Sequence, residues 1–431
     1  MVIQPNPVFA KLPTTIFTVM SALAVEHGAV NLGQGFPDED GPESIREAAA
    51  KALRDGPNQY APMRGMPALR GAICAHARRF YDLRFDPDAN VVVTSGGTEA
   101  LTASIMGLVG EGGEVVLIDP SYDSYRPIAE AAGARVRTVK LAPPDCRLDA
   151  DALAAAITPD TRAVMLNSPL NPIGRAFTRE ELDGVARVLA RSNAVAICDE
   201  VYEHLIFDDR EHIPLMTLPG MAERVVRVGS AGKMFSLTGW KIGWVTGPAA
   251  LIDVIAKAHQ FITFATSPAL QLGIAYALEH EIDFTLDLTK RLQANRDLLA
   301  DALPRLGFDA LPCEGSYFLT AGIRSLTNES DRDFCERLTR EAGVALIPLS
   351  VFFNSGEPDH LVRFAFCKKR AVLEEALSRL EKYFHAVART GSSPAKRGRG
   401  TTRSVVEGVD AASRPPPGLR PYSPRKRGES Q

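Results

Sequence analysis

Short apolar runs alternate with helical patterns through much of the chain. The runs at 91–94, 115–118, 163–166, 194–198, 225–228 and 242–246 have the length and composition of buried strands. The segments between them carry apolar residues at helical spacing. Strands that alternate with helices predict an α/β fold, in which a mostly parallel sheet is covered on both faces by helices.

The pattern changes twice after residue 250. Residues from about 284 to 303 predict one long helix, which we expect to lead into a smaller carboxy-terminal domain ending near residue 384. The last 44 residues, 388–431, include 18 Pro, Gly or Ser residues, ten Lys or Arg and three Asp or Glu. Few large apolar residues and a net charge of +7 predict a disordered basic tail.

Composition narrows the class of protein. A chain of 431 residues, with 45% hydrophobic and 23% charged residues and a net charge of −3, is ordinary globular material and long enough for two domains. No run reaches the ~18 apolar residues of a membrane span, and no secretory signal is evident. Six scattered cysteines favour a reducing, cytoplasmic location. The eight histidines show no metal-binding spacing, so we expect no metal. We also expect neither a membrane nor nucleic acid as a partner.

A lysine in the glycine-rich stretch 229–244 is the first candidate for chemistry. Ser230 lies three residues before Lys233, and Lys241 lies eight residues after it. A lysine that binds an aldehyde covalently, beside a hydroxyl and a cation that hold a phosphate, is what pyridoxal phosphate (PLP) chemistry requires. A glycine-rich surface loop is the alternative that this stretch alone leaves open.

Two polar residues follow the apolar run at 194–198. Asp199 comes directly after it, and the carboxyl end of a buried strand is where open α/β sheets bind ligands. An acid there can pair with the pyridine nitrogen of PLP and keep it protonated; a helix cap is the alternative. Tyr202 can donate to the phenolic oxygen of the cofactor, or belong to the core.

A glycine pair marks the expected phosphate end. Gly96, Gly97 and Thr98 separate the run at 91–94 from a helical pattern at 99–106. Free backbone N–H groups and the helix dipole at such a turn favour an anion, although many such turns are only caps.

Together these residues resemble the class I/II aminotransferases of PLP fold type I, especially the branch with kynurenine, glutamine and methionine aminotransferases. The resemblance extends from about residue 31 to about residue 382. Further matching motifs follow in the family's order at 31–37, 58–60, 121–125, 171–174 and 360–364. The implied fold is a large domain with a seven-stranded, mostly parallel sheet and a smaller α/β domain. The implied boundaries are 1–45 (arm and substrate loop, part of the small domain), 46–290 (large domain), 291–387 (small domain) and 388–431 (tail).

The resemblance assigns a role to each matched residue. Those around the cofactor are Lys233 (covalent attachment), Gly96, Gly97, Thr98, Ser230 and Lys241 (phosphate), Asp199 (ring nitrogen), Tyr122 (ring stacking), and Asn171 and Tyr202 (phenolic oxygen). Tyr60 would reach the phosphate of the neighbouring subunit, which implies a homodimer. Arg363 would bind the substrate α-carboxylate, together with Asn171 and Gly35.

The implied activity is ping-pong transfer of an amino group from an L-amino acid to a 2-oxo acid. Aromatic, methionine, glutamine and kynurenine-type donors remain open, because one carboxylate-binding arginine does not select a side chain. The alternatives are cysteine-conjugate β-elimination, an N-succinyl-diaminopimelate substrate, and a PLP-binding regulator without catalysis.

Overall fold

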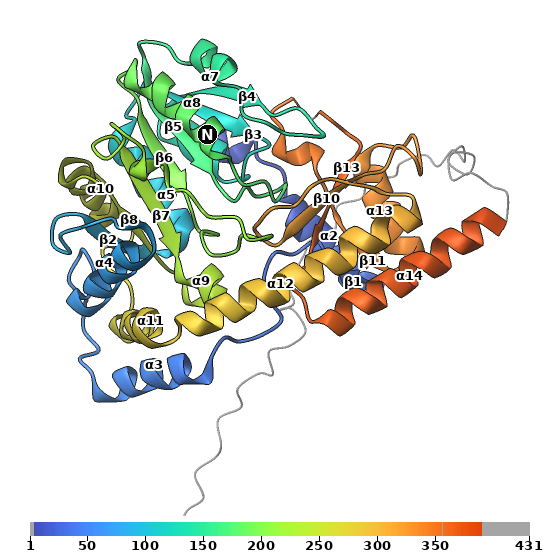
Figure 1. Cartoon of the computed structure of the whole chain (residues 1–431), viewed down its shortest axis with the longest axis horizontal. Helices are drawn as coiled ribbons and strands as arrows, with labels where there is room; N and C mark the ends of the chain where they lie inside the picture. Colours follow the sequence, from blue (N-terminus) through green and yellow to red (C-terminus); the bar gives the residue numbers. More distant parts are fainter. Residues whose placement is uncertain (1–3, 356, 390–431) are drawn as a thin grey trace, which may run out of the picture. The chain divides into compact units, whose positions relative to one another are not determined.

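A seven-stranded sheet forms the centre of the larger part of the chain. The computed structural model describes residues 4–355 and 357–389. The strands of this sheet are β2 (Val91–Ser95), β3 (Glu114–Asp119), β4 (Arg135–Lys140), β5 (Thr161–Asn167), β6 (Val195–Asp199), β7 (Val225–Ser230) and β8 (Ile242–Thr246). They lie in the order β2-β8-β7-β6-β5-β3-β4, and within this sheet β8 alone runs antiparallel to its neighbours (Figure 1). The prediction of a mostly parallel α/β sheet is confirmed.

Strand β4 is the one strand of this sheet that the apolar runs did not indicate. It lies at the edge and pairs only with β3. Its residues alternate between charged and less polar types, and most of them are partly or fully exposed. An edge strand with one solvated face has no continuous apolar run, so its sequence resembles a loop.

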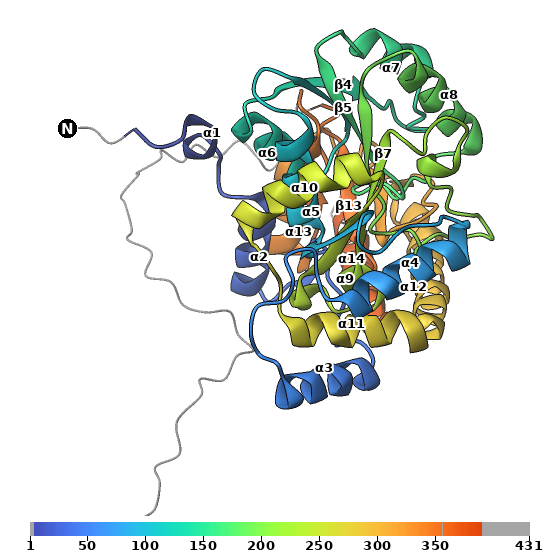
Figure 2. The same ribbon diagram turned by 90° about the vertical axis from the view of Figure 1, so that its left-hand side faces the viewer.

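Helices cover both faces because alternate strand residues point in opposite directions. Val115 and Leu117 of β3 pack in one apolar cluster with α5 (Gly96–Leu108) and α10 (Ala249–Ile262). Val116 and Ile118 of the same strand pack in a second cluster with α8 (Arg179–Ala190) and α12 (Ile282–Ala302). Figure 2 shows α5 and α10 lying together on the first face.

A third apolar cluster covers the β2 edge. Val91, Val93 and Trp244 contact α4 (Pro67–Tyr81) and α11 (Pro268–His280), and α3 (Glu43–Asp55) packs on the outside of α11 (Figures 1 and 2). Helix α5 begins at Gly96 itself, so the expected turn of glycines before the helix is its first turn. The remaining helices of this part are α6 (Tyr125–Ala131), α7 (Ala150–Ala156), α9 (Ala231–Met234), and the 3₁₀ turns η1 (Leu215–Thr217) and η2 (Thr238–Trp240).

The second part of the structure joins the two ends of the described chain. Its antiparallel sheet has the order β12-β13-β10-β9, with bounds Ile347–Pro348, Leu361–Ala365, Phe318–Gly322 and Asp309–Ala310. A parallel pair links β1 (Val30–Asn31) to β11 (Val344–Ala345). The helices here are α2 (Ile16–Glu26), α13 (Asp331–Glu341) and α14 (Arg370–Arg389), with η3 (Leu303–Leu306) and η4 (Ser350–Phe352), whereas α1 (Pro7–Ala10) lies against α6.

One predicted helix is found where the sequence placed it, and one predicted boundary needs correction. The predicted long helix is α12, which starts at Ile282 and ends at Ala302. Helix α14 continues to Arg389, so Ala388 and Arg389 are helical and the predicted tail cannot begin at residue 388. Helix α14 is amphipathic and buries Leu373, Leu377 and Leu380 on one face, which stabilises the helix. The rest of the predicted tail, 390–431, lies outside the described residues.

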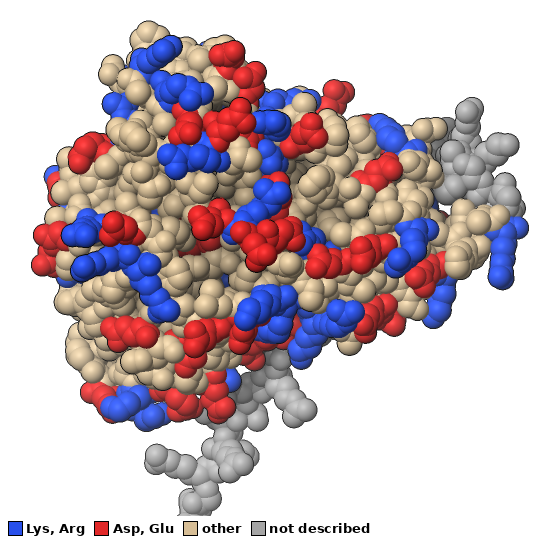
Figure 3. Space-filling view, viewed as in Figure 1, with Lys and Arg blue, Asp and Glu red and all other residues tan. Residues whose placement is uncertain are grey.

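The surface carries both signs of charge side by side. On the face in Figure 3, Lys and Arg lie among Asp and Glu without a separate patch of either sign. Pairs of opposite charge four residues apart also occur on exposed helix surfaces, for example Arg379 with Glu375 and Lys257 with Asp253. In the described part of the chain, no helix is long and apolar enough to cross a membrane.

Candidate active site

The predicted site residues converge on one cavity at the carboxyl ends of the parallel strands. Asp199 ends β6, Ser230 ends β7, and Gly96 follows β2, as expected for ligand sites in open α/β sheets. The cavity has a volume of about 300 Å³. It is lined by every predicted site residue except Tyr60, namely Gly35, Gly96, Gly97, Thr98, Tyr122, Asn171, Asp199, Tyr202, Ser230, Lys233, Lys241 and Arg363.

Lys233 adds a half-buried amine to this set. It lies in the short helix α9, which directly follows β7. Burial lowers the pKa of Lys233 to about 8; Asp199 opposes the shift, and the cations Lys241 and Arg363 reinforce it. The lowered pKa raises the neutral fraction of the amine to about a tenth at pH 7, and a neutral amine is the nucleophilic form. The amine donates a hydrogen bond to the Tyr317 hydroxyl at 2.6 Å.

Asp199 is a buried acid without a cationic side chain bound to it. Its carboxylate accepts hydrogen bonds from the Tyr125 hydroxyl at 2.6 Å and the Val201 backbone N–H at 3.4 Å. Burial raises the pKa of Asp199 to about 6, although the Tyr125 hydrogen bond opposes the shift. The site thus offers a fixed carboxylate that a cationic ring nitrogen would stabilise.

Lys241 forms the cationic end of the cavity. It borders the first turn of α5, where a Cβ atom at Gly96 would lie 3.1 Å from the Lys241 amine. Gly96 has φ of +74°, a conformation that favours glycine, so both the close approach and the backbone geometry require this residue. Among the described residues no carboxylate lies within ion-pair distance of Lys241, which lines the cavity with Thr98 and Ser230. A helix amino terminus beside an unpaired cation suits a phosphate.

Arg363 is the largest fully buried side chain of the described residues, and it also lines the cavity. It lies on β13, donates to Asn171 Oδ1 and to the Gly33 carbonyl at 2.9 Å each, and leaves its Nε without a partner. The guanidinium lies over the Phe318 ring at 4.0 Å from the centroid. Burial lowers the pKa of Arg363 to about 10. Asp123 interacts with it electrostatically, but no described acid forms an ion pair with it. A buried, unpaired arginine facing a cavity suits a carboxylate ligand.

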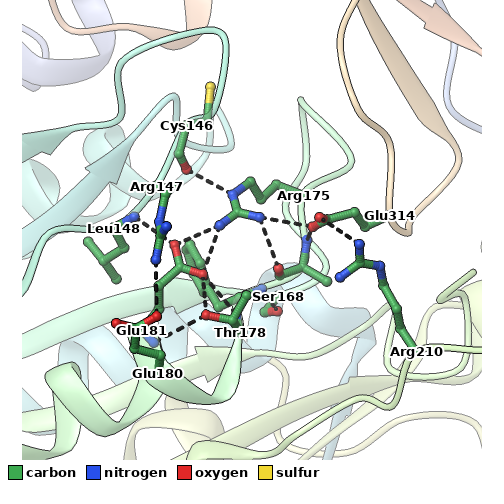
Figure 4. A network of polar contacts seen from close by, with 12 residues as sticks. Cys146, Arg147, Leu148, Ser168, Arg175, Thr178, Glu180, Glu181, Arg210 and Glu314 are labelled. Carbon is green, nitrogen blue, oxygen red and sulfur yellow. Dashed lines mark hydrogen bonds and ion pairs between the residues drawn. The ribbon is translucent and has the colours of Figure 1, made fainter.

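A polar network holds the turn that carries Asn171. Two residues after Ile173, Arg175 donates to both oxygens of Glu181 at 2.7 and 2.8 Å and to Glu314 at 3.0 Å (Figure 4). Glu314 lies three residues before Tyr317, and its backbone N–H donates to the Gly174 carbonyl. The network therefore fixes the Asn171 turn against the segment that leads into β10.

Tyr60 is the one predicted site residue that does not line this cavity. Its side chain is 86% exposed and contacts the Phe264 ring edge-on at 5.4 Å. Phe261, also 86% exposed, lies in the same segment as Phe264. A contiguous exposed aromatic patch is a common feature of interaction surfaces.

Several residues of the site were not predicted from the sequence. Phe17 and Phe318 line the cavity, Asn167 lines it and donates to the Asp199 carbonyl at 2.8 Å, and Tyr125 and Tyr317 bond Asp199 and Lys233. Asn167 ends β5, so the position of Asp199 at the end of β6 was a signal that could have found it. The others come from segments that approach the site only in the folded chain.

A histidine cluster also forms that no spacing in the sequence indicated. The Nε2 atoms of His76 and His204 lie 2.7 Å apart, and Glu203 lies close enough for the three to hold a metal ion. The two nitrogens bond each other, and Glu203 accepts from Arg227 at 3.0 Å. Burial lowers the pKa of His204 to about 3, so this ring is neutral. The groups satisfy one another without a metal.

The chain is similar to known proteins over most of its length. The family model for aminotransferase class I and II matches residues 28–380. The chain is 47% identical over 379 residues to a probable N-succinyldiaminopimelate aminotransferase of Mycobacterium tuberculosis, covering 85% of this chain and 95% of that protein. It is 42% identical over 378 residues to the methionine aminotransferase of Escherichia coli, covering 88% and 98%.

Solved structures extend the agreement to the fold. The M. tuberculosis N-succinyldiaminopimelate aminotransferase superposes with a TM-score of 0.86 at 46% identity, over 88% of this chain and all of that one. An E. coli protein with a methionine aminotransferase function gives 0.86 at 41% identity, over 88% of this chain and all of that one. The chain therefore belongs to the class I and II aminotransferases, PLP-dependent enzymes that move an amino group between amino acids and 2-oxo acids.

Proposed function

We propose that the cavity around Lys233 is the active site of this aminotransferase and that Lys233 binds PLP covalently. The single observation that carries the proposal is one cavity that brings together an amine of lowered pKa, Lys233, an unpaired cation, Lys241, and a buried acid, Asp199. None of the three has an ion-pair partner among the described residues, and PLP carries an aldehyde, a phosphate and a ring nitrogen that match them. When bound, PLP supplies an electron-withdrawing ring that stabilises negative charge on the substrate.

The phosphate end has its own complement of groups. The first turn of α5 presents the backbone of Gly96, Gly97 and Thr98, and Lys241 adds a full positive charge. Ser230 adds a hydroxyl from the end of β7. At the other end Asp199 would hold the ring nitrogen, and Tyr202 and Asn171 would bond the phenolic oxygen. The broad face of Tyr122 suits stacking on the ring.

Arg363 and Asn171 would bind the substrate carboxylate. They already share a hydrogen bond, so one arginine nitrogen is oriented by Asn171 while Nε stays available. Gly35 borders this end of the cavity, and a Cβ atom there would overlap the Phe318 ring. The backbone can therefore approach the substrate only if residue 35 is glycine.

Lys233 would carry the proton steps. Once the amino donor occupies the cavity, the freed Lys233 amine would take the proton from the donor Cα and pass it to the cofactor, and in the return half-reaction it would give a proton to the Cα of the 2-oxo acid. Its lowered pKa favours the neutral, basic form that this requires. Exclusion of water by Phe17 and Phe318 keeps the transfer between the intended atoms.

The lining favours donors with one carboxylate and an apolar side chain. The cations that line the cavity in the described chain are Lys233, Lys241 and Arg363, and each has a role already. Phe17, Tyr122 and Phe318 supply apolar surface. We therefore propose methionine and aromatic amino acids as donors, with glutamine and kynurenine as related candidates.

N-succinyl-diaminopimelate is the second candidate, because the M. tuberculosis relative that carries this name is 47% identical. Its additional carboxylates would need cations from outside this cavity. Cysteine-conjugate β-elimination at the same site is the third. A panel of donors and 2-oxo acids separates these: efficient turnover of methionine supports the proposal, and turnover of the succinylated donor alone overturns the substrate assignment.

We also propose a homodimer in which Tyr60 reaches the partner's phosphate site. The exposed Tyr60–Phe264 pair and Phe261 support a covered apolar patch. The division into a large domain at 46–290 and a small domain from 1–45 and 291–387 is part of this proposal, supported by the pairing of β1 with β11. A cytoplasmic location is proposed because all six cysteines are unpaired.

A further inference from the structure

A chain of two hydrogen bonds connects Lys233 to the backbone of the substrate loop. The Lys233 amine donates to the Tyr317 hydroxyl, and that hydroxyl donates to the Gly35 carbonyl, each at 2.6 Å. Tyr317 is 1% exposed and follows a loop that the Arg175 network holds in place. The three groups come from α9, the start of β10 and the amino-terminal segment, so only the folded chain brings them together.

The direction of these bonds is fixed by chemistry. A carbonyl oxygen can only accept, so the single hydroxyl proton of Tyr317 is committed to Gly35. Burial raises the pKa of Tyr317 well above its ordinary value, so the hydroxyl keeps that proton. Tyr317 can therefore only accept from Lys233. A neutral Lys233 amine that gives one N–H to Tyr317 has its lone pair directed away from the tyrosine.

Lys233 also needs such a restraint, because it lines two cavities. The second cavity, of about 60 Å³, is lined by Lys233 and Tyr317 with Cys367, Asn295, Leu288 and other residues. Tyr317 lines this second cavity and does not line the main one. An amine without the tyrosine hydroxyl can direct its lone pair toward either space, whereas the observed bond holds one N–H on Tyr317 and so keeps the lone pair away from the tyrosine side.

We propose that Tyr317 is a positioning residue, which holds the free amine of Lys233 with its lone pair toward the main cavity and couples it to the Gly35 loop. This inference rests on the proposed role of Lys233. The coupling follows from the shared hydroxyl: a shift of the Gly35 carbonyl on substrate binding moves Tyr317 and, through it, the amine. The Gly35 backbone also lies close to the Phe318 ring, so the loop that carries Gly35 and the segment that carries Tyr317 and Phe318 should move together.

The first test uses the cofactor-free protein. Lys233 is labelled with an amine-reactive acylating reagent over a range of pH, and its modification is measured by peptide mass spectrometry. In Tyr317→Phe we expect the midpoint pKa of Lys233 to fall, because the hydroxyl that accepts from the ammonium form is gone. Tyr276→Phe removes a phenol from α11, away from the cavity, and should leave the profile unchanged.

The second test uses the holoenzyme and a donor deuterated at Cα. In Tyr317→Phe, kcat should fall about tenfold or more, since misplacement of a reacting group slows chemistry by such factors. The deuterium isotope effect on kcat should rise, KM should stay within about threefold, and the cofactor content should match wild type. A merely structural role would lower cofactor content or stability and leave the isotope effect unchanged.

Replacement of Tyr317 by 3-fluorotyrosine provides a variant that keeps the ring and the fold. Its hydroxyl is a weaker acceptor, so the Lys233 profile should shift in the same direction by less. An unchanged labelling profile together with an unchanged isotope effect overturns the proposal, whatever happens to kcat. Failure of the proposed function gives a different result, because Lys233→Ala would then remain active while the Tyr317 labelling shift could still be present.

Discussion

Arg363 and Arg227 are two buried arginines, and the structure predicts that the same substitution will affect protein stability very differently at the two positions. Arg227 is 6% exposed and donates to Glu200 at 2.6 Å and to Glu203 at 3.0 Å. Its neighbouring carboxylates raise its pKa above the usual value. Arg363 is 1% exposed and has no acidic partner within ion-pair distance among the described residues; burial lowers its pKa to about 10. One charge is compensated by the protein, and the other is not.

The substitution is methionine at each position, which keeps an unbranched apolar stem. Arg227→Met leaves Glu200 and Glu203 buried without their cation, and removing one partner of a buried pair costs about 3–5 kcal/mol of stability. Arg363→Met removes an uncompensated charge, so the free energy of unfolding of the cofactor-free protein should change by less than about 1 kcal/mol. Urea denaturation of both variants and wild type measures the difference.

Arg363→Met should greatly lower catalytic activity, although it should hardly change stability. Loss of a charge-assisted contact with the substrate carboxylate costs about 2–5 kcal/mol, or roughly thirtyfold to several-thousandfold in kcat/KM. The assay is turnover of methionine with a 2-oxo acid by the holoenzyme. If Arg363→Met loses as much stability as Arg227→Met, or keeps kcat/KM within threefold of wild type, then Arg363 is a structural cation and the substrate assignment is wrong.

Three further outcomes are expected. Lys233→Ala should keep PLP only non-covalently and lose turnover by several orders of magnitude, whereas Lys257→Ala on the exposed side of α10 should stay active; the visible spectrum and a turnover assay show both. Because burial raises the pKa of Asp199 from 3.8 to about 6, the cofactor-free native state retains a proton that the unfolded chain releases, so the contribution of Asp199 to stability falls as pH rises from about 4 to 6. Asp199→Asn should lack that loss, which amounts to roughly 3 kcal/mol. The difference in denaturation midpoint between the variant and wild type should therefore change between pH 4 and pH 7, and the same difference at both pH values would contradict this. Tyr60→Ala should weaken PLP binding, and light scattering should show a dimer; an active monomer at assay concentration would refute the shared site.

Much of the sheet could be predicted because its strands are buried on both faces. Such strands read as continuous apolar runs, and β6 and β8 were located to within one residue at each end. Strand β4 was missed because it is an edge strand with alternating charges. Residues at fixed positions relative to these strands, such as Asp199 after β6 and Gly96 after β2, were accessible for the same reason: local sequence places them at the carboxyl edge of the sheet.

The sequence by itself determined the class of fold and nominated Lys233, Asp199 and Lys241, because each lies within or directly beside a pattern that local physics makes recognisable. The tertiary structure alone decided which groups surround them. Tyr317 lies 84 residues from Lys233 and 282 residues from Gly35 along the chain, yet it bonds both. No local pattern encodes such a contact, since it depends on how the second sheet packs against the first. The missing partner of Arg363 was equally invisible, because whether a charge is buried and unpaired is a property of the folded chain.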